Sequence, residues 1–433
     1  MSQPAPDWVA YHATRSPHSL ALESVDTGAT LTWAALEQQV ARVAGYLASI
    51  GISAGDRIVL LTENDLRVFV LQFACMRIGA ILVPLNWRLA PSELEALCAD
   101  ADPRVVVHDG TWAEIGQQLA ELTDAASTAW HGPPGVPDLD TEAAEAPPMP
   151  ASTAHSFDDP THILYTSGTT GRPKGALVTN GTLFWQWANA VPVSALTGYG
   201  SKYLDPLPLF HAGGLTTLAA PVHRSGGCVA VARRFDPEQC LAWLSDPAHG
   251  VTHFNAPPIM WQAMSELPAF DDADLSRMHH AHVAGSVMPV ELFTRWHERG
   301  LGIQQHYGGT EMGPSATALP ATDVVRKIGS CGLPVMHTRA RLVDESGEDV
   351  PTGRPGEIWL DGPSVTPGYW RRGRPEESFD GRWFRTGDGA TRDDDGYVFI
   401  ADRLKDMFKS GGESVFPAEI GRASCRERVS ECV

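Results

Sequence analysis

Apolar residues recur at helical spacing between residues 31 and 50, at Leu31, Trp33, Leu36, Val40, Val43 and Leu47. This spacing predicts a helix with one buried face. Gly51 predicts the end of the helix, and the apolar run 57–61 predicts a strand after it. The alternation continues through residues 69–78, 81–85, 92–99 and 104–108. Such a rhythm of helices and strands is typical of a parallel sheet covered by helices.

A second series of helices and strands is expected between about residues 177 and 320, with strands at 228–231, 251–254 and 280–284. From residue 326 onward, short strands separated by Gly and Pro (340–343, 357–360 and 397–400) predict an antiparallel β lobe. Residues 131–151 contain six prolines, and we expect a solvent-exposed connection there. The pattern therefore predicts an α/β protein with βα subdomains at about 1–150 and 177–320 and a β lobe at 326–402.

The composition excludes several classes of partner. The net charge of −19 over 433 residues argues against binding to nucleic acid or to anionic membranes, since both require clustered Lys and Arg. The seven cysteines show no CxxC or Cys/His metal spacing, which suits a reducing compartment. The start of the chain has no apolar signal segment, and no run of about 18 apolar residues occurs. We therefore expect a cytoplasmic protein with small-molecule partners.

One segment has the chemistry of a phosphate cradle: Thr166-Ser167-Gly168-Thr169-Thr170-Gly171-Arg172-Pro173-Lys174-Gly175. It follows the apolar run 163–165, which predicts a strand ending where the glycines begin. Glycines let the backbone approach an anion closely, while hydroxyl and N–H groups donate hydrogen bonds to it. Arg172 and Lys174 add positive charge. The segment is not the P-loop of common NTPases, because no Gly-Lys-Ser/Thr ends it.

Four later segments supply partners for such a site. Gln304-Gln305-His306-Tyr307-Gly308-Gly309-Thr310-Glu311 combines an aromatic ring, small residues, a hydroxyl and a carboxylate. A lone carboxylate beside substrate phosphates suits Mg²⁺. Trp383-Phe384-Arg385-Thr386-Gly387-Asp388 ends in a second carboxylate, a natural acceptor for a vicinal diol. Asp402-Arg403-Leu404-Lys405-Asp406 and Ser410-Gly411-Gly412-Glu413 follow.

Together these motifs resemble the signatures of the adenylate-forming superfamily, which includes acyl-CoA synthetases, luciferases and the adenylation domains of peptide synthetases. The resemblance covers about residues 10–420. It implies that ATP, Mg²⁺ and coenzyme A take part, with Glu311 holding the metal and Lys405 acting as a hinge. The catalytic residues implied are Thr166, Lys174, His211, Thr310 and Glu311. The nucleotide-binding residues implied are Thr166, Ser167, Gly168, Thr169, Thr170, Gly171, Lys174, Gly285, Ser286, Tyr307, Gly308, Thr310, Asp388 and Arg403.

The segment Pro206–Gly214 resembles the acyl-pocket segment of acyl-CoA synthetases, with His211 as a gate or a pocket wall. Amino-acid-activating relatives carry an aspartate in this neighbourhood, and we expect this stretch to be apolar instead. The other expected pocket residues are Val283, Ala284, Gly285, Gly308 and Gly309. Small residues there favour a planar aryl acid.

The wider sequence resembles bacterial feruloyl-CoA synthetases, so we expect an AMP-forming acid–CoA ligase acting on ferulate or a related hydroxycinnamate. A medium-chain fatty acid as substrate and a carrier protein as acceptor stay open. The oligomeric state, including a homodimer, also stays open.

The end of the chain breaks the pattern of the family. Residues 403–420 are expected to form the hinge and the start of a small C-terminal domain, whereas residues 421–433 concentrate Arg and Cys without periodicity. We expect residues 421–433 to be non-native and the small C-terminal domain to be truncated. No lysine follows Lys409. The lysine that the family uses on the carboxylate and α-phosphate is therefore absent, and we expect the chain to be weakly active or inactive.

Overall fold

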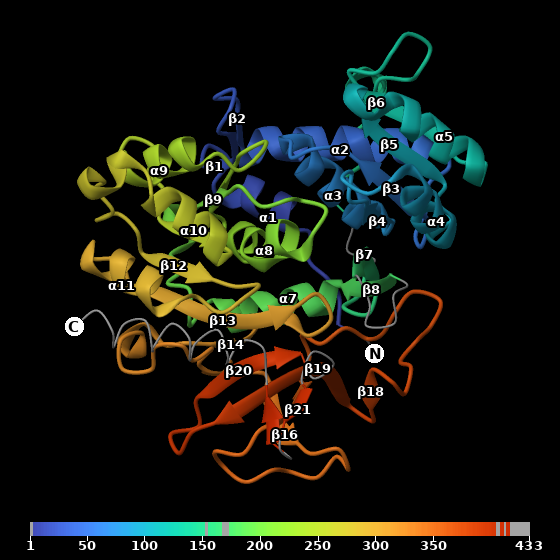
Figure 1. Ribbon diagram of the computed structural model, residues 1–433. Helices are drawn as coiled ribbons and strands as arrows, with labels where there is room; N and C mark the ends of the chain where they lie inside the picture. Colours follow the sequence, from blue (N-terminus) through green and yellow to red (C-terminus); the bar gives the residue numbers. More distant parts are fainter. Residues whose placement is uncertain (1–2, 152–154, 167–172, 404–407, 411–412, 416–433) are drawn as a thin grey trace.

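The computed structural model describes residues 3–151, 155–166, 173–403, 408–410 and 413–415. Two large sheets with helices around them lie above a separate β lobe (Figure 1). The predicted α/β class and the antiparallel character of the lobe are confirmed. Among the described residues, no helix is long and apolar enough to span a bilayer.

The first sheet has six strands in the order β6-β5-β3-β4-β7-β8. Their bounds are β3 (Arg57–Leu61), β4 (Ile81–Pro84), β5 (Val105–Asp109), β6 (Ala126–Trp130), β7 (Pro160–Thr166) and β8 (Lys174–Thr179). The neighbouring pairs are parallel except β7–β8, which is an antiparallel hairpin. The helices of this part are α2 (Trp33–Ser49), α3 (Leu66–Ile78), α4 (Pro91–Ala101), α5 (Ala113–Thr123) and α6 (Leu139–Glu145). β7 ends at Thr166, where the glycine-rich segment begins, as predicted.

The second sheet has nine strands in the order β15-β14-β13-β12-β11-β9-β10-β1-β2. Their bounds are β1 (Leu20–Ser24), β2 (Thr30–Thr32), β9 (Lys202–Asp205), β10 (Cys228–Val231), β11 (His253–Ala256), β12 (His280–Val283), β13 (Ile303–Gly309), β14 (Gly313–Ala318) and β15 (Leu333–Pro334). The helices of this part are α1 (Trp8–Arg15), α7 (Asn180–Ala190), α8 (Ala219–Arg224), α9 (Pro237–Ser245), α10 (Pro258–Ser265) and α11 (Val290–Glu298). The run from β1 to β13 across the sheet is parallel.

The third sheet is the β lobe, built from β16 (Arg339–Val343), β17 (Gly356–Asp361), β18 (Phe379–Asp380), β19 (Trp383–Arg392) and β20 (Val398–Arg403). A small hairpin of β21 (Phe408–Ser410) and β22 (Glu413–Val415) follows it. The five described cysteines are buried and unpaired.

The predicted subdomain boundaries need correction. β1 and β2 pair into the second sheet, although they precede the whole first series, and β7 and β8 extend the first sheet to Thr179. Pairing between strands far apart in sequence leaves no trace in local periodicity, so the sequence pattern could not place them. The expected exposed connection is also wrong in part, because α6 buries Leu139 and Ala143 in the same core as α2.

The main core lies between the two sheets. Trp33 of α2 and Phe69 of α3 are fully buried there, together with apolar residues of α8 and of strands from both sheets. Thr32 caps α2 by accepting a hydrogen bond from the Ala35 N–H, and Gly79 ends α3 at a positive φ of 75°. This shared core holds the strand ends of the two sheets in fixed positions, on which the candidate site depends.

Candidate functional site

The Glu311 carboxylate lies where the two sheets meet. The Thr166 hydroxyl, at the end of β7, donates to Glu311 Oε1 at 2.8 Å, and the Tyr369 hydroxyl donates to the same oxygen at 3.2 Å. The backbone N–H of Thr366 binds the Glu311 carbonyl at 2.7 Å. The structure thus brings together Thr166 and Glu311, which are 145 positions apart. The contact of Tyr369 with Glu311 was not predicted from the sequence.

Lys174, at the start of β8, is almost completely buried. Its Nζ lies 3.2 Å from Glu377 Oε1, 3.3 Å from Ser378 Oγ and 5.2 Å from the centre of the Tyr369 ring. The Lys174 ammonium must therefore give up its contact with Glu377 before it can make the expected contact with phosphate. Thr310, directly before Glu311, is buried too.

The predicted ribose residue lies beside the predicted adenine residue. The Tyr307 hydroxyl donates to Asp388 Oδ2 at 2.6 Å, so the end of β13 is tied to β19 of the β lobe. Burial, together with the negative charge of Asp388, raises the pKa of Tyr307 well above its usual value, so Tyr307 stays a neutral donor. Arg403 stands opposite Asp388 in the β19–β20 ladder, and its expected role at the nucleotide stays a prediction.

Gln305 holds the loop that carries Gly285 and Ser286, two of the expected nucleotide-binding residues. Its Oε1 accepts from the Met288 N–H at 2.9 Å, and its Nε2 donates to the carbonyls of Val283 and Ser286 at 3.3 and 3.2 Å. The sequence contained Gln305 within the motif, but its role in fixing this loop was not foreseen. Gly285, within the loop, has a φ of 88° and open space where a Cβ would lie.

The expected pocket glycines differ from one another in their surroundings. A Cβ on Gly308 would collide with the backbone of Gly313 and Pro314, so this glycine is required by the β13–β14 hairpin itself. A Cβ on Gly309 would face the side chain of Met312. Val283 points into the core and is fully buried, whereas Ala284 and Ser286 are accessible. The geometry therefore supports Ala284 and Gly285 most directly as wall residues.

His211 is exposed after the apolar segment, and its Nδ1 accepts from the Gly213 N–H at 3.0 Å. Desolvation by the surrounding protein lowers the pKa of His211, and the charge of Glu311 opposes this shift. Asp205, directly before the segment, is completely buried, so a carboxyl group lies next to this apolar stretch. Burial raises the pKa of Asp205 well above its usual value, which favours the neutral acid. Sequence reasoning missed this carboxyl because Asp205 lies just before the recognised segment.

Several expected residues lie outside the described part of the chain. These are the phosphate-loop residues Ser167, Gly168, Thr169, Thr170 and Gly171 and the hinge residue Lys405. Their roles stay predictions.

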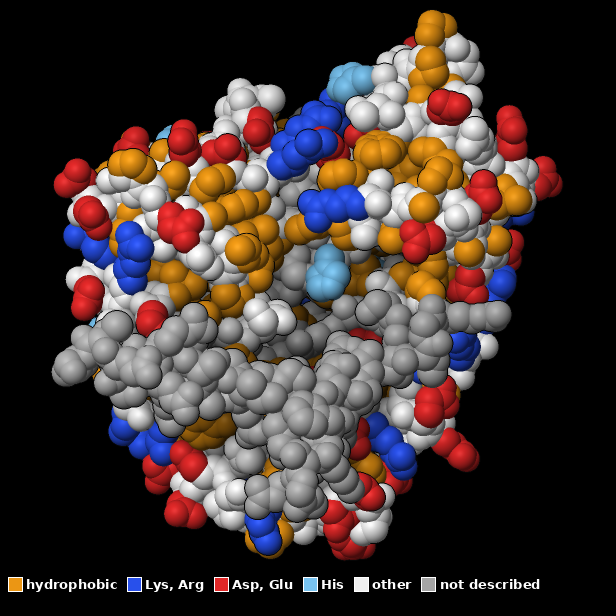
Figure 2. All heavy atoms as spheres, viewed as in Figure 1, with side chains coloured by type: hydrophobic (Ala, Val, Ile, Leu, Met, Phe, Trp, Pro, Cys, Tyr) orange, Lys and Arg blue, Asp and Glu red, His pale blue; other side chains and the backbone are white. Residues whose placement is uncertain are grey.

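The face drawn in Figure 2 is hollowed near its centre, at the junction of the parts that carry the two sheets. Hydrophobic side chains gather around the hollow, with Lys, Arg and His side chains beside them.

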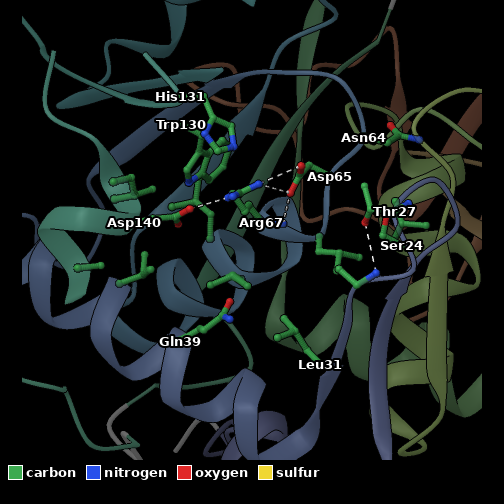
Figure 3. A pocket seen from close by; sticks show the side chains of 18 of the residues that line it. Ser24, Thr27, Leu31, Gln39, Asn64, Asp65, Arg67, Trp130, His131 and Asp140 are labelled. Carbon is green, nitrogen blue, oxygen red and sulfur yellow. Dashed lines mark hydrogen bonds and ion pairs between the residues drawn. The ribbon is translucent and has the colours of Figure 1, made fainter. Parts of the chain in front are cut away.

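A cavity of about 650 Å³ lies elsewhere, lined mainly by α2, α3, α6 and the connection between β1 and β2 (Figure 3). Arg67, bound to Asp65 and Asp140, is part of its wall. None of the described residues of the recognised motifs lines this cavity, so it is separate from the part of the candidate site that the structure describes.

Comparison with known proteins identifies the family of the chain. The AMP-binding enzyme family matches residues 9–370. The chain is 39% identical to a feruloyl-CoA synthase of Amycolatopsis sp, covering 95% of this chain and 81% of that protein. It is 33% identical to the indoleacetate–CoA ligase of Aromatoleum aromaticum (96% and 81% covered) and 32% identical to the long-chain-fatty-acid–CoA ligase FadD13 of Mycobacterium tuberculosis (94% and 80% covered).

Two solved structures resemble the whole chain. ATP-bound MatB from Rhodopseudomonas palustris superposes with a TM-score of 0.86 at 30% identity, covering 96% of this chain and 82% of MatB. The inhibitor-bound N-terminal domain of FACL13 from Mycobacterium tuberculosis has a TM-score of 0.84 at 28% identity, covering 93% of this chain and 100% of that domain. The motifs, their arrangement and these similarities lead to one conclusion: the chain belongs to the AMP-binding enzyme family, among its acid–CoA ligases.

Proposed function

We propose that this protein activates ferulate or a related hydroxycinnamate with ATP and transfers the acyl group to coenzyme A. The observation that carries the proposal is the contact of Thr166, Glu311 and Tyr369, which joins the predicted phosphate loop to the predicted metal ligand. The 39% identity to a feruloyl-CoA synthase favours an aryl acid.

The residues around Glu311 fit a magnesium ion. A carboxylate fixed by two hydroxyl donors, beside a loop of phosphate-binding type, is the kind of site in which Mg²⁺ binds one carboxylate and substrate phosphates. When bound, the ion would neutralise phosphate charge. Thr166 and Tyr369 orient the carboxylate, and Lys174 would add a second positive charge at the phosphates once it leaves Glu377.

The other residues would hold the nucleotide. Tyr307 fixes the orientation of Asp388, whose carboxylate would accept hydrogen bonds from the ribose hydroxyls. Gln305 holds residues 284–286 in place, where they would form a wall beside the adenine. The carboxylate oxygen of the acid then attacks the α-phosphorus, and pyrophosphate leaves. In the second step the CoA thiolate attacks the acyl carbon, and AMP leaves with the bridging oxygen. An acyl adenylate hydrolyses readily, so the pocket must exclude water.

The test is pyrophosphate release with a panel of acids, measured for this chain and for a version extended to the length of its relatives. Ferulate, p-coumarate and caffeate should exceed octanoate in kcat/KM. Higher activity with octanoate would favour a fatty acid, and turnover only with a pantetheinyl protein would make a carrier the acceptor.

A cytoplasmic location and the oligomeric state stay predictions.

A further inference from the structure

Four neighbouring strands of the second sheet each carry a buried polar side chain near the carboxyl end. We call this set the polar row: Asp205 on β9, Asn255 on β11, His282 on β12 and His306 on β13. Each has one side-chain atom without a hydrogen-bond partner among the described residues: Asp205 Oδ2, Asn255 Oδ1, His282 Nε2 and His306 Nε2. Buried polar atoms are rarely left unpaired, so four in adjacent positions require an explanation.

The polar row lies on one face of the sheet. Asn255 stands beside His282 in the parallel ladder, and His282 stands beside Gln304, two residues before His306. Because side chains alternate between faces, the residues between them point to the opposite face. Most of those residues are apolar and belong to one hydrophobic core (Leu204, Phe254, Ala281, Val283 and Ile303), whereas Gln305 is polar but has hydrogen-bond partners for its side chain. Among the described residues of these four strands, the buried polar atoms without a partner therefore lie on one face.

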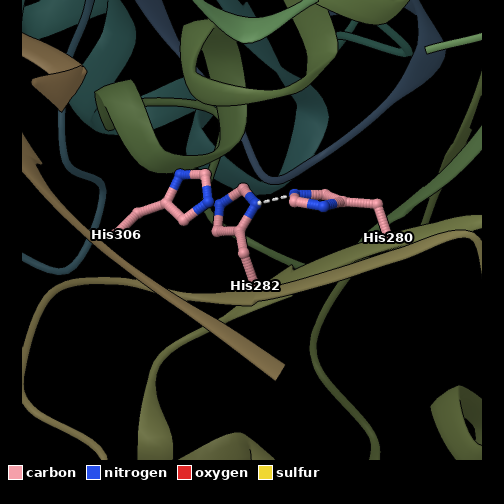
Figure 4. A group of neighbouring side chains, drawn as sticks. All are labelled: His280, His282 and His306. Atoms are coloured by element: carbon pink, nitrogen blue, oxygen red, sulfur yellow. Dashed lines mark hydrogen bonds between the residues drawn. The ribbon is translucent and has the colours of Figure 1, made fainter. Parts of the chain in front are cut away.

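A hydrogen-bond relay fixes which atom of His282 carries a proton. Gln304 Nε2 donates to the Leu319 carbonyl at 2.8 Å, so Gln304 Oε1 accepts from His280 Nδ1 at 2.8 Å. Burial lowers the pKa of His280 and His282 well below the usual value, so both rings are neutral. His280 Nε2 then accepts from His282 Nδ1 at 2.9 Å (Figure 4). His282 Nε2 is consequently a lone-pair acceptor.

The three histidines could also be considered as metal ligands, since their nitrogens lie within 4.8 Å of one another. The ring geometry argues against this. His282 and His306 are stacked, with centroids 4.3 Å apart and planes at 12°. Imidazole lone pairs lie in the ring plane, so stacked rings do not direct them at a common ion. The His282 nitrogen nearest His280 is already engaged in the relay. The cluster suits a hydrogen-bonding ligand better.

Asp205 complements this acceptor. Its Oδ1 accepts from the Tyr203 hydroxyl at 3.0 Å and from the Leu207 N–H at 3.1 Å. In the neutral acid that burial favours, the proton therefore lies on Oδ2, which becomes a donor. The row thus offers a donor at Asp205 and acceptors at Asn255 and His282, a set that matches neutral hydroxyl groups, which both donate and accept.

The position of the row connects it with the acid substrate. Ligands of open parallel sheets bind beyond the carboxyl ends of the strands. Asp205 precedes the segment Pro206–Gly214, which contains His211. His282 precedes the expected pocket residues 283–285, and His306 precedes Tyr307. The row therefore lies at the base of all three segments expected to surround the acyl group.

We propose that the polar row is the subsite for the far end of the acid substrate, with His282 Nε2 accepting a hydrogen bond from a hydroxyl group there. The assignment rests on the proposed function, because it concerns the same acyl site. It narrows the substrate class to acids with a hydroxyl group remote from the carboxylate.

Binding of stable acyl-adenylate mimics to this chain tests the assignment without requiring turnover. Calorimetry would compare the adenosine sulfamates of 4-hydroxycinnamate, cinnamate and 4-methoxycinnamate on the unmodified protein and on His282→Phe. His162→Phe is the matched control, because His162 is also fully buried with an unpartnered Nε2 but lies on β7 of the other sheet.

We expect the 4-hydroxycinnamate ligand to bind about tenfold more tightly than the cinnamate ligand. The 4-methoxycinnamate ligand should not show this gain in affinity, because a methoxy group cannot donate a hydrogen bond. The preference should vanish in His282→Phe and persist in His162→Phe. Equal binding of the hydroxyl and methoxy ligands, or an unchanged preference in His282→Phe, would overturn the assignment. If His282→Phe does not fold, the methoxy comparison on the unmodified protein decides.

Failure of the proposed function gives a different result. In that case no cinnamoyl ligand binds, whereas an octanoyl ligand does. The affinities of the ω-hydroxyoctanoyl and octanoyl adenosine sulfamates are then compared in the same way. A preference for the hydroxylated member would support the row, and its absence would overturn it.

Discussion

The two large sheets differ in what their buried strands contain. In the six-stranded sheet, β3 and β4 bury Ile, Val and Leu on both faces, as in Ile58, Val59, Leu60 and Leu61. In the nine-stranded sheet, β11 and β12 place apolar residues on one face and Asn255, His280 and His282 on the other. Both patterns are equally buried, so burial alone does not distinguish them.

The difference indicates that the two sheets have different roles, one in stability and the other in ligand binding. A sheet buried on both faces needs only apolar side chains to be stable. Polar groups cost free energy when they are buried, so a sheet that keeps them on one face has a reason other than stability. The first sheet supplies the core and the strand that leads into the phosphate loop, whereas the second carries the polar row.

Substitutions of buried residues should show the difference between the two sheets most clearly, in the free energy of unfolding. Leu60→Ala in β3 should lower the free energy of unfolding by about 2.7–5 kcal/mol, because it leaves a cavity. Asn255→Leu in β11 should change it by only about 1 kcal/mol, since it removes an unpaired acceptor along with one polar side chain. Urea unfolding of both variants measures these changes in the free energy of unfolding. Equal losses of free energy in the two variants would contradict the idea that the sheets have different roles.

The contact between the sheets should matter for catalysis rather than for folding. Glu311→Gln should reduce adenylation about 10²–10³-fold, the effect typical of losing one preorganised electrostatic group, while the unfolding midpoint stays close to that of the unmodified protein. Pyrophosphate release by the version extended to the length of its relatives measures this. Glu348→Gln, an exposed change in the β lobe, is the control. Near-normal release from Glu311→Gln would refute the metal assignment.

The β lobe should contribute to nucleotide affinity. Asp388→Ala should weaken AMP binding by about 1.5–3 kcal/mol, the range for hydrogen bonds to a charged group. Calorimetry with this chain suffices, and Asp394→Ala, an exposed change in the same lobe, should bind normally. A nucleotide-bound crystal structure with the ribose turned away from Asp388 would disprove the assignment.

Acid should destabilise the protein through histidines of both sheets. Burial lowers the pKa of His162 and His306 to about 3 each, so the folded protein keeps them neutral while the unfolded chain binds protons below about pH 6.5. Stability is therefore lost as pH falls from 7 to 5, by about 2 kcal/mol for each such histidine.

Replacing either histidine by Phe should reduce the loss of unfolding free energy between pH 7 and pH 5 by about 2 kcal/mol, as measured by urea unfolding at the two pH values. A reduced loss in one variant alone would show that the two environments differ.

The two variants should differ in ligand binding, because only His306 belongs to the polar row.

Much of the fold could be predicted from local pattern. The strands at 57–61 and 228–231 have the predicted bounds, because short apolar runs between turn signals are decided locally. The phosphate loop was placed after a strand for the same reason. The pairing of β1 with β10 and the packing of α6 on α2 were not predictable, since they depend on contacts between distant segments.

The sequence by itself determined the family, the order of the motifs and the chemical types of the site residues, since these depend on residue identity and spacing along the chain. Only the tertiary structure decided that Thr166 and Tyr369 hold Glu311, that Gln305 fixes the loop between Val283 and Met288, and that Lys174 lies against Glu377. It alone aligned Asp205, Asn255, His282 and His306 on one face. The physical reason is that register between strands, and with it the partner of each buried polar atom, is set by packing across the whole sheet.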